Sequence, residues 1–347
     1  MSSIVSLIGY HLVDTYNASN WFTKFDTLAI PDPTHGSVEY VSYNEAKLDG
    51  LAAIKNNQVY MGVDYKTNGL GTTKGRKSMR VSSRRAYTKG LFVADIEHMP
   101  ASSKNGCGLW PAWWTFGPHW PHSGEIDIIE GVNSNTGNQM TLHTSDGCLV
   151  ENTGSARSTI FNVTEDADCE GFNGCPQITP DTTSYGQGFN AIHGGVYAME
   201  WTDTAIAVWF FHRHDARLRG LLDDVAPDPV RLGTPRARFT GPRCDFASHF
   251  RTHNIIFDTT FCGDWAEPNF QADPACNMLA PTCQAYVADN AADFAEAYWL
   301  VNSIRVFQTR NSSVVENPTI GTRAAAPLRA RHRPSVPRGR TLLNSWF

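Results

Sequence analysis

Apolar and polar residues alternate over short segments along most of this chain, and glycine and proline separate the segments. From Tyr10 to Pro100 the period is the two-residue period of half-buried strands, with no helical period. Residues 197–211 predict two strands around the turn Thr202-Asp203-Thr204, and residues 284–296 predict one or two turns of helix. The other clear strands are 77–83, 87–99 with a break at Lys89-Gly90, and 297–308. The pattern therefore predicts an all-β protein.

The stretch Trp110–Asn133 is the most unusual part of the chain. It holds four of the ten tryptophans, followed by three carboxylates within six residues. The carboxylates are those of Glu125, Asp127 and Glu130. Acids beside aromatic platforms suggest chemistry on sugars, because pyranose rings stack their C–H faces on aromatic rings.

The acids lie in GEIDIIEGV, which alternates polar with β-branched residues between two glycines and so predicts a strand. In a regular strand Glu125 and Asp127 share one face, and Glu130 points to the other. A β-bulge at Ile128 or Ile129 would turn Glu130 onto the face of the other two acids. We therefore expect a bulged strand that presents all three carboxylates on one surface.

Three carboxylates on one surface suit a two-step displacement. One ionised glutamate attacks the anomeric carbon, and a second, protonated glutamate protonates the leaving oxygen and later activates water. A carboxylate between them shifts the pKa of a neighbouring acid or holds its orientation. The alternative is a solvated acidic face, because this acid spacing also arises by chance in a chain of this length.

Strand geometry predicts which of the tryptophans share a face. Trp110 and Trp114 are expected on one face, and Trp113 on the other, so that one side packs in the core and the other faces a cleft. Core packing is the commoner fate of a tryptophan. The roles of Trp110 and Trp113 stay open.

The composition fits one large β domain: the 347 residues include 28 glycines and 19 prolines. The formal net charge of −5 gives no reason to expect a nucleic-acid partner, and no apolar run is long enough to span a membrane. Residues 321–347 hold six arginines and no acid, and disorder is expected there. The expected divisions are an atypical N-terminus at 1–9, a catalytic domain at 10–309 and a basic tail at 310–347.

Eight cysteines without a C-x-x-C pair predict disulfides in an oxidising compartment. Short loops favour the pairs Cys169–Cys175 and Cys276–Cys283. The sequence also contains N-glycosylation sequons at Asn17, Asn162 and Asn311, which agree with secretion. Residues 1–9 are too short for a secretory leader. We therefore expect a secreted protein whose signal peptide is absent from this sequence or truncated in it.

The segment Glu125–Glu130 resembles the motif E-[ILV]-D-x-x-E of family 16 glycoside hydrolases, in the bulged form of the laminarinase branch. Further segments that resemble fungal laminarinases are 32–41, 77–83, 139–144, 257–266 and 297–308. The resemblance implies a curved, concanavalin-like β-sandwich of the jelly-roll kind with a concave substrate cleft. It also implies that Glu125 is the nucleophile, Glu130 the acid/base and Asp127 the assisting carboxylate.

The same resemblance assigns Trp114, Trp120 and Trp265 to sugar stacking. It places Arg80 near the cleft, where the alternative is a surface cation. His143 is expected to hydrogen-bond a catalytic carboxylate or a sugar hydroxyl, and the alternative is a structural histidine. Residues 212–243 depart from the family pattern, and locally altered sequence is expected there.

The function that follows is retaining endo-hydrolysis of β-1,3 and mixed β-1,3/1,4 glucans by a monomer. The enzyme needs no cofactor, and no acidic loop is specific enough to name metal ligands. Two alternatives stay open: a transglycosylase that passes the glycosyl group to another glucan, and a glucan-binding lectin of the same fold.

Overall fold

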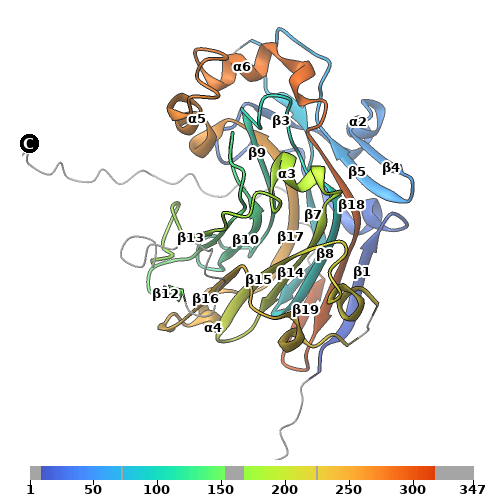
Figure 1. Cartoon of the computed structure of the whole chain (residues 1–347), viewed down its shortest axis with the longest axis vertical. Coiled ribbons are helices and arrows are strands. Elements are labelled where there is room, and N and C mark those ends of the chain that lie inside the picture. The colour runs from blue at the N-terminus through green and yellow to red at the C-terminus, as the bar shows by residue number, and fades with distance from the viewer. Residues whose placement is uncertain (1–8, 72, 153–167, 224–225, 317–347) are drawn as a thin grey trace, which may run out of the picture.

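Two large antiparallel β-sheets lie face to face and form a sandwich (Figure 1). The computed structural model describes residues 9–71, 73–152, 168–223 and 226–316. Because alternate side chains of each strand point to opposite faces, the inward-facing residues of both sheets share one core. The all-β sandwich expected from the sequence is confirmed.

One sheet has nine strands. In spatial order they are β12 (Leu149–Asn152), β16 (Ala237–Arg243), β15 (Ala205–His212), β14 (Gly195–Trp201), β8 (Gly90–His98), β18 (Tyr298–Gln308), β5 (Gln58–Gly62) and β4 (Ala52–Lys55), with β1 (His11–Asn17) paired to β18.

The other sheet has eight strands, and β10 lies near its middle. In spatial order they are β13 (Cys175–Ile178), β11 (Gln139–His143), β10 (Glu125–Glu130), β9 (Leu109–Phe116), β17 (His253–Phe261), β7 (Arg80–Thr88) and β19 (Ser313–Glu316), with β2 (Phe25–Thr27) paired to β7. A separate parallel pair consists of β3 (Val38–Tyr40) and β6 (Arg76–Ser78).

Aromatic side chains join the two sheets in the main core. Trp113 of β9 stacks on Phe257 of β17, with ring centroids 5.9 Å apart. Phe257 in turn meets the ring of Trp299 of β18 edge-on at 5.1 Å. All three side chains are buried. Trp113 is therefore a core residue, on the strand face opposite Trp114.

Within residues 212–243, the described part of the segment between β15 and β16 covers part of the outer face of the nine-stranded sheet. Leu221 and Leu232 are buried there in one cluster with Trp209 of β15. The indole N–H of Trp209 donates to the carbonyl of Gly233 at 2.8 Å. The sequence of this segment departs from the family pattern, but its described part packs against the sheet.

The helices are short; α5 and α6 lie together at one end of the sandwich, whereas α4 lies toward the other end (Figure 1). Within the described residues, none of them is long and apolar enough to cross a membrane. They are α1 (Trp21–Lys24), α2 (Tyr43–Leu48), α3 (Gly186–Ala191), α4 (Phe246–His249), α5 (Gly263–Ala272), α6 (Cys283–Asp289), a π-turn η1 (Arg219–Asp223) and the 3-10 turns η2 (Pro229–Leu232) and η3 (Ala291–Phe294).

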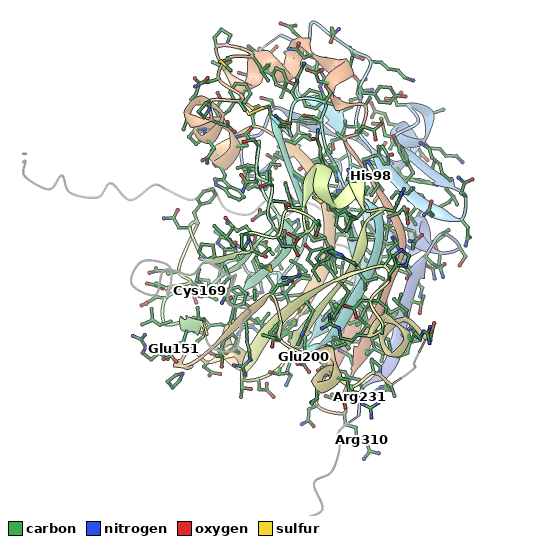
Figure 2. All side chains as sticks on the ribbon, viewed as in Figure 1. His98, Glu151, Cys169, Glu200, Arg231 and Arg310 are labelled. Atoms are coloured by element: carbon green, nitrogen blue, oxygen red, sulfur yellow. A yellow bond between two sulfur atoms is a disulfide. The ribbon has the colours of Figure 1, made fainter. Side chains whose placement is uncertain are left out.

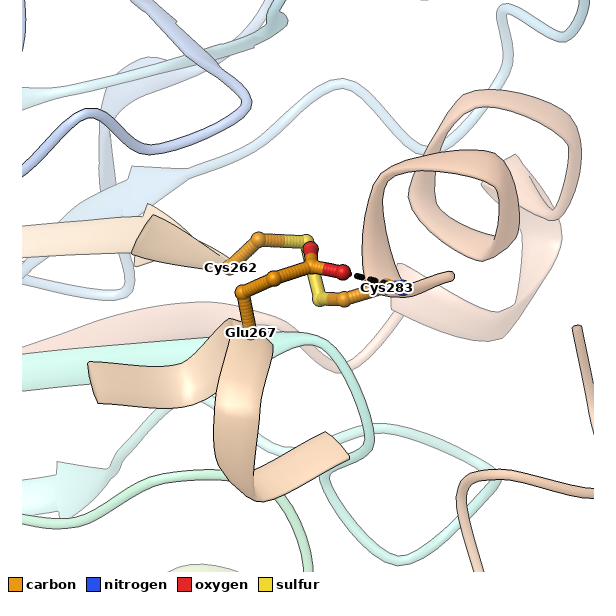
Figure 3. Close-up of side chains that lie close together, drawn as sticks. All are labelled: Cys262, Glu267 and Cys283. Carbon is orange, nitrogen blue, oxygen red and sulfur yellow. Dashed lines mark hydrogen bonds between the residues drawn. A yellow bond between two sulfur atoms is a disulfide. The ribbon is translucent and has the colours of Figure 1, made fainter. Parts of the chain in front are cut away.

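All eight cysteines form disulfides, but not all in the expected pairs. Cys169–Cys175 is confirmed. The pair Cys276–Cys283 is wrong, because Cys276 bonds Cys107 and Cys283 bonds Cys262 (Figure 3). Cys107 precedes β9 and Cys262 follows its neighbour β17, so both bonds tie the α5–α6 region to the sheet end instead of closing a loop within it. The fourth bond is Cys148–Cys244.

Beyond residue 309, Ser313–Glu316 forms β19 and pairs with Thr88–Arg85 of β7. The predictions for residues 1–8, for the arginine-rich part of the tail and for the sequon at Asn162 lie outside the described residues.

Candidate active site

Strand β10 carries the bulge that the sequence predicts. Its pairing with β9 runs Asp127 to Trp114 and then Ile129 to Trp113, so that Ile128 is the extra residue. The isoleucines of β10 are fully buried, whereas Glu125 and Glu130 both line the cleft on the other face. One inserted residue thus changes the alternation and brings Glu130 to the face of Glu125.

The side chain of Asn138 holds the bulge in place. Its Nδ2 donates to the carbonyl of Ile128 at 2.7 Å, and its Oδ1 accepts from the backbone N–H of Glu130 at 3.0 Å. Asn138 is fully buried, and its own N–H donates to Ser184 Oγ at 3.2 Å. The amide therefore substitutes for the strand partner that a bulge removes.

A cleft with a volume of about 250 Å³ opens over the bulged strand. Its wall includes both glutamates and all five side chains predicted to bind substrate. Those five are Arg80, Trp114, Trp120, His143 and Trp265. Asp127 is 2 % exposed and lies behind the wall between the two glutamates on β10.

His143 in the cleft wall and the buried Asp127 behind it form an ion pair. The distance from His143 Nε2 to Asp127 Oδ2 is 3.1 Å, and His143 Nδ1 lies 2.9 Å from the carbonyl of Gly171. Burial alone lowers the pKa of this imidazole, but Asp127, Glu125 and the Gly171 carbonyl together raise the His143 pKa to about 10. His143 is therefore a cation at neutral pH, with Nδ1 donating to the Gly171 carbonyl. The ion pair with Asp127 places His143 beside an acid of the motif.

Burial and the charge of Asp127 raise the pKa of both glutamates. The pKa of Glu125 rises to about 8, and that of Glu130 rises well above its ordinary value. His143 opposes the rise at both glutamates, and Arg80 also opposes it at Glu125. Both carboxyls therefore hold their protons to higher pH than a free glutamate does.

Trp110 contacts one of the two glutamates directly. Its indole N–H donates to Glu130 Oε1 at 2.8 Å, which favours the ionised carboxylate and limits the rise of the Glu130 pKa. Its ring also meets Trp265 edge-on, with centroids 5.5 Å apart. Trp110, left open on sequence, is thus a cleft residue that positions an acid.

Arg80 is buried in the cleft wall and not a surface cation. Its guanidinium lies 3.3 Å from Asp258 Oδ2, and its Cζ stands 4.9 Å from the ring centre of Trp114. Burial raises the pKa of Asp258 to about 7, although Arg80 opposes the rise. The pair joins β7 to β17, at positions directly opposite each other in the register.

Two groups of side chains in the described residues have the spacing of metal ligands. The first is Cys262, Glu267 and Cys283, but its sulfurs form a disulfide, and Glu267 Oε1 accepts from the backbone N–H of Cys283 at 3.2 Å (Figure 3). The second is Glu125, Asp127 and His143. A metal needs a neutral imidazole, so the raised pKa of His143 opposes metal binding there.

Sequence reasoning missed Asn138 and Asp258. Asn138 stands in a loop without periodicity, and nothing nearby marks its side chain as the partner of a bulge. Asp258 had a signal, because a carboxylate in the middle of a long apolar strand needs a partner. That partner, Arg80, lies 178 positions earlier in the chain and is brought close only by the sheet.

The fold, the bulged acid motif and the aromatic cleft agree with one family model. The model described as "XgeA-like, catalytic GH16 domain" matches residues 25–307. The chain belongs to glycoside hydrolase family 16. This confirms the resemblance inferred from the motif at Glu125–Glu130.

Relatives with similar sequences and similar solved structures support this family assignment. An "Endo-1,3(4)-beta-glucanase" of Arthroderma benhamiae is 41% identical over 305 residues, which are 86% of this chain and 65% of that protein. The chain thus spans slightly less than two thirds of that relative. Laminarinase 16A of Phanerochaete chrysosporium, solved with two β-glucans in donor and acceptor sites, is 37% identical with a TM-score of 0.78, covering 86% of this chain and all of that one. An elongating family 16 β-1,3-glucosyltransferase is 38% identical with a TM-score of 0.77, over the same shares.

Proposed function

We propose that this protein is a retaining endo-hydrolase of β-1,3 and mixed β-1,3/1,4 glucans. The observation that carries the proposal is the bulge of β10, which presents Glu125 and Glu130 in one cleft with the Asp127–His143 pair between them. The name of the Arthroderma relative and the glucans bound by laminarinase 16A support this substrate class.

The family motif and the surroundings of the two glutamates support the division of labour. His143 and Arg80 favour the ionised form of Glu125, so it is the nucleophile. Burial and the charge of Asp127 favour the protonated form of Glu130, so it is the general acid. Asp127, paired with His143, is the assisting carboxylate, and its charge raises the pKa of both glutamates.

The reaction then runs in two balanced steps. The Glu125 carboxylate attacks the anomeric carbon as the glycosidic bond breaks, and Glu130 gives its proton to the leaving oxygen. Glu130, now ionised, takes a proton from water, which displaces Glu125 from the glycosyl ester. Both proton and carboxylate return to their starting places, and the product keeps the β-configuration.

A second candidate is transglycosylation, in which a glucan hydroxyl replaces the water of the second step. The similarity to the elongating glucosyltransferase favours it, because that structure matches this chain as well as the laminarinase does. The first step and the roles of the three acids are the same in both candidates. The candidates differ only in what enters the cleft after the first product leaves.

Digestion of laminarin and lichenan by the wild type and by the variant Glu125→Gln tests the proposal. We expect the wild type to release short β-glucan oligosaccharides and the folded variant to release none. Products longer than an added oligosaccharide indicate transfer. Laminarin that is bound but left uncut would support a lectin instead. We also propose secretion, for which the four disulfides argue.

A further inference from the structure

Phe172 places an exposed aromatic ring in the cleft. It is 42% exposed, and among the exposed large apolar side chains of the described residues it is the one that lines the cleft. Asn173 beside it is also exposed and lines the same wall. A bare aromatic ring next to an amide offers both stacking and hydrogen bonding to a sugar.

The loop that carries Phe172 is short and tied at both ends. The disulfide Cys169–Cys175 closes it, with both sulfurs buried, and Figure 2 shows Cys169 on the side of the molecule where β12 and β13 lie. The backbone of Thr144 also binds the loop. The N–H of Thr144 donates to the carbonyl of Cys169 at 2.7 Å, and the carbonyl of Thr144 accepts from the N–H of Gly171 at 3.1 Å. The ring of Phe172 is thus presented by an ordered backbone.

The same loop packs directly on the catalytic surface. The carbonyl of Gly171 lies 2.9 Å from His143 Nδ1. Gly174 has a φ of +57°, and a Cβ added there would lie 2.8 Å from His143 Cε1 and 2.5 Å from the carbonyl of Leu142. Only glycine permits this approach. The position of Phe172 is therefore coupled to that of His143, which holds Asp127.

Phe172 and the Arg80–Asp258 pair lie on opposite sides of the two glutamates. The loop leads into the edge strand β13, whereas Arg80 and Asp258 lie on β7 and β17, and β10 runs between them. A glucan that crosses the strands through the cleft would reach Phe172 several units from Arg80. The reacting bond would lie between the two.

We propose that Phe172 is a stacking platform for a glucosyl unit beyond the reacting bond, on the β13 side of the cleft. The inference rests on the proposed glucanase function and assigns a specificity-determining residue to it. The ring increases the affinity of the protein only for substrates that are long enough to reach it. Its contribution therefore grows with the length of the oligosaccharide.

The test compares the wild type with Phe172→Ala on laminaritriose through laminariheptaose. For the long substrates we expect kcat/KM to fall roughly two- to tenfold, which corresponds to the free energy of one aromatic stacking contact. For laminaritriose we expect a smaller change. Phe172→Trp restores the wild-type profile. Tyr65→Ala, which removes a ring of similar exposure outside the cleft wall, is the matched control and leaves every value unchanged.

Binding is measured separately, so that failure of the inference and failure of the proposed function can be told apart. In a Glu125→Gln background, which stops turnover, Phe172→Ala weakens the affinity for laminariheptaose by a similar factor in titration calorimetry. Equal affinities and length profiles for Phe172→Ala and wild type overturn the platform. A wild type that cleaves no β-glucan refutes the proposed function, and the calorimetric arm still decides on Phe172.

Discussion

The side chain of Asn138 and the backbone of Glu130 form the contact that sets the geometry of the acids. Asn138 Oδ1 accepts from the N–H of Glu130 at 3.0 Å, while its Nδ2 donates to the carbonyl of Ile128 at 2.7 Å. Glu130 points into the cleft only while β10 keeps its extra residue. The conformation of the reacting strand thus depends on a side chain outside the motif.

Asn138→Ala should therefore damage both stability and activity. The variant leaves two buried backbone groups, the N–H of Glu130 and the carbonyl of Ile128, without a hydrogen-bond partner. This loss lowers the free energy of unfolding by about 2–4 kcal/mol. Urea denaturation measures this loss. We expect kcat to fall at least about tenfold, because a displacement of Glu130 by a fraction of an ångström misaligns proton transfer.

Asn138→Asp is the control for that variant. Its carboxylate can still accept from Glu130 N–H but cannot donate to Ile128. An intermediate loss of stability is expected. If the alanine variant keeps wild-type stability and kcat, Asn138 does not hold the bulge.

Trp110→Phe should shift the alkaline limb of the pH profile. The indole N–H donates to Glu130 Oε1 and so favours the ionised form. Its removal raises the pKa of Glu130, and because the acid must be protonated to react, the alkaline limb of kcat/KM moves to higher pH. Trp265→Phe is the matched control, since its ring packs on Trp110 without donating to either glutamate in the described structure. A shift to lower pH would exclude this role of the hydrogen bond.

Glu125→Gln should change how stability depends on pH. Burial and the charge of Asp127 raise the pKa of Glu125 from 4.5 to about 8 in the folded protein. Between these values the folded state holds a proton that the unfolded chain has released, so the wild type loses stability as the pH rises. The variant lacks this proton and should gain in melting temperature relative to wild type from pH 5 to pH 8. A constant difference across that range would show that Glu125 has an ordinary pKa.

The sequence predicted the site more fully than it predicted what holds the site together. Alternation in β10 and β9 is a local property, so the bulge and the opposite faces of Trp113 and Trp114 could be inferred from neighbouring residues. The partners of Arg80 and Cys276 lie far away in the chain, and only the assembled sheet brings them close. Loop length alone therefore gave a wrong partner for Cys276.

The stereochemistry of the first product tests the central claim most directly. Laminaripentaose is digested by the wild type in an NMR tube, and the anomeric proton signals are recorded before mutarotation. The proposed double displacement by Glu125 and Glu130 predicts that the β-anomer appears first and the α-anomer only later. An α-anomer that appears first would mean inversion, and would contradict the roles proposed for both glutamates.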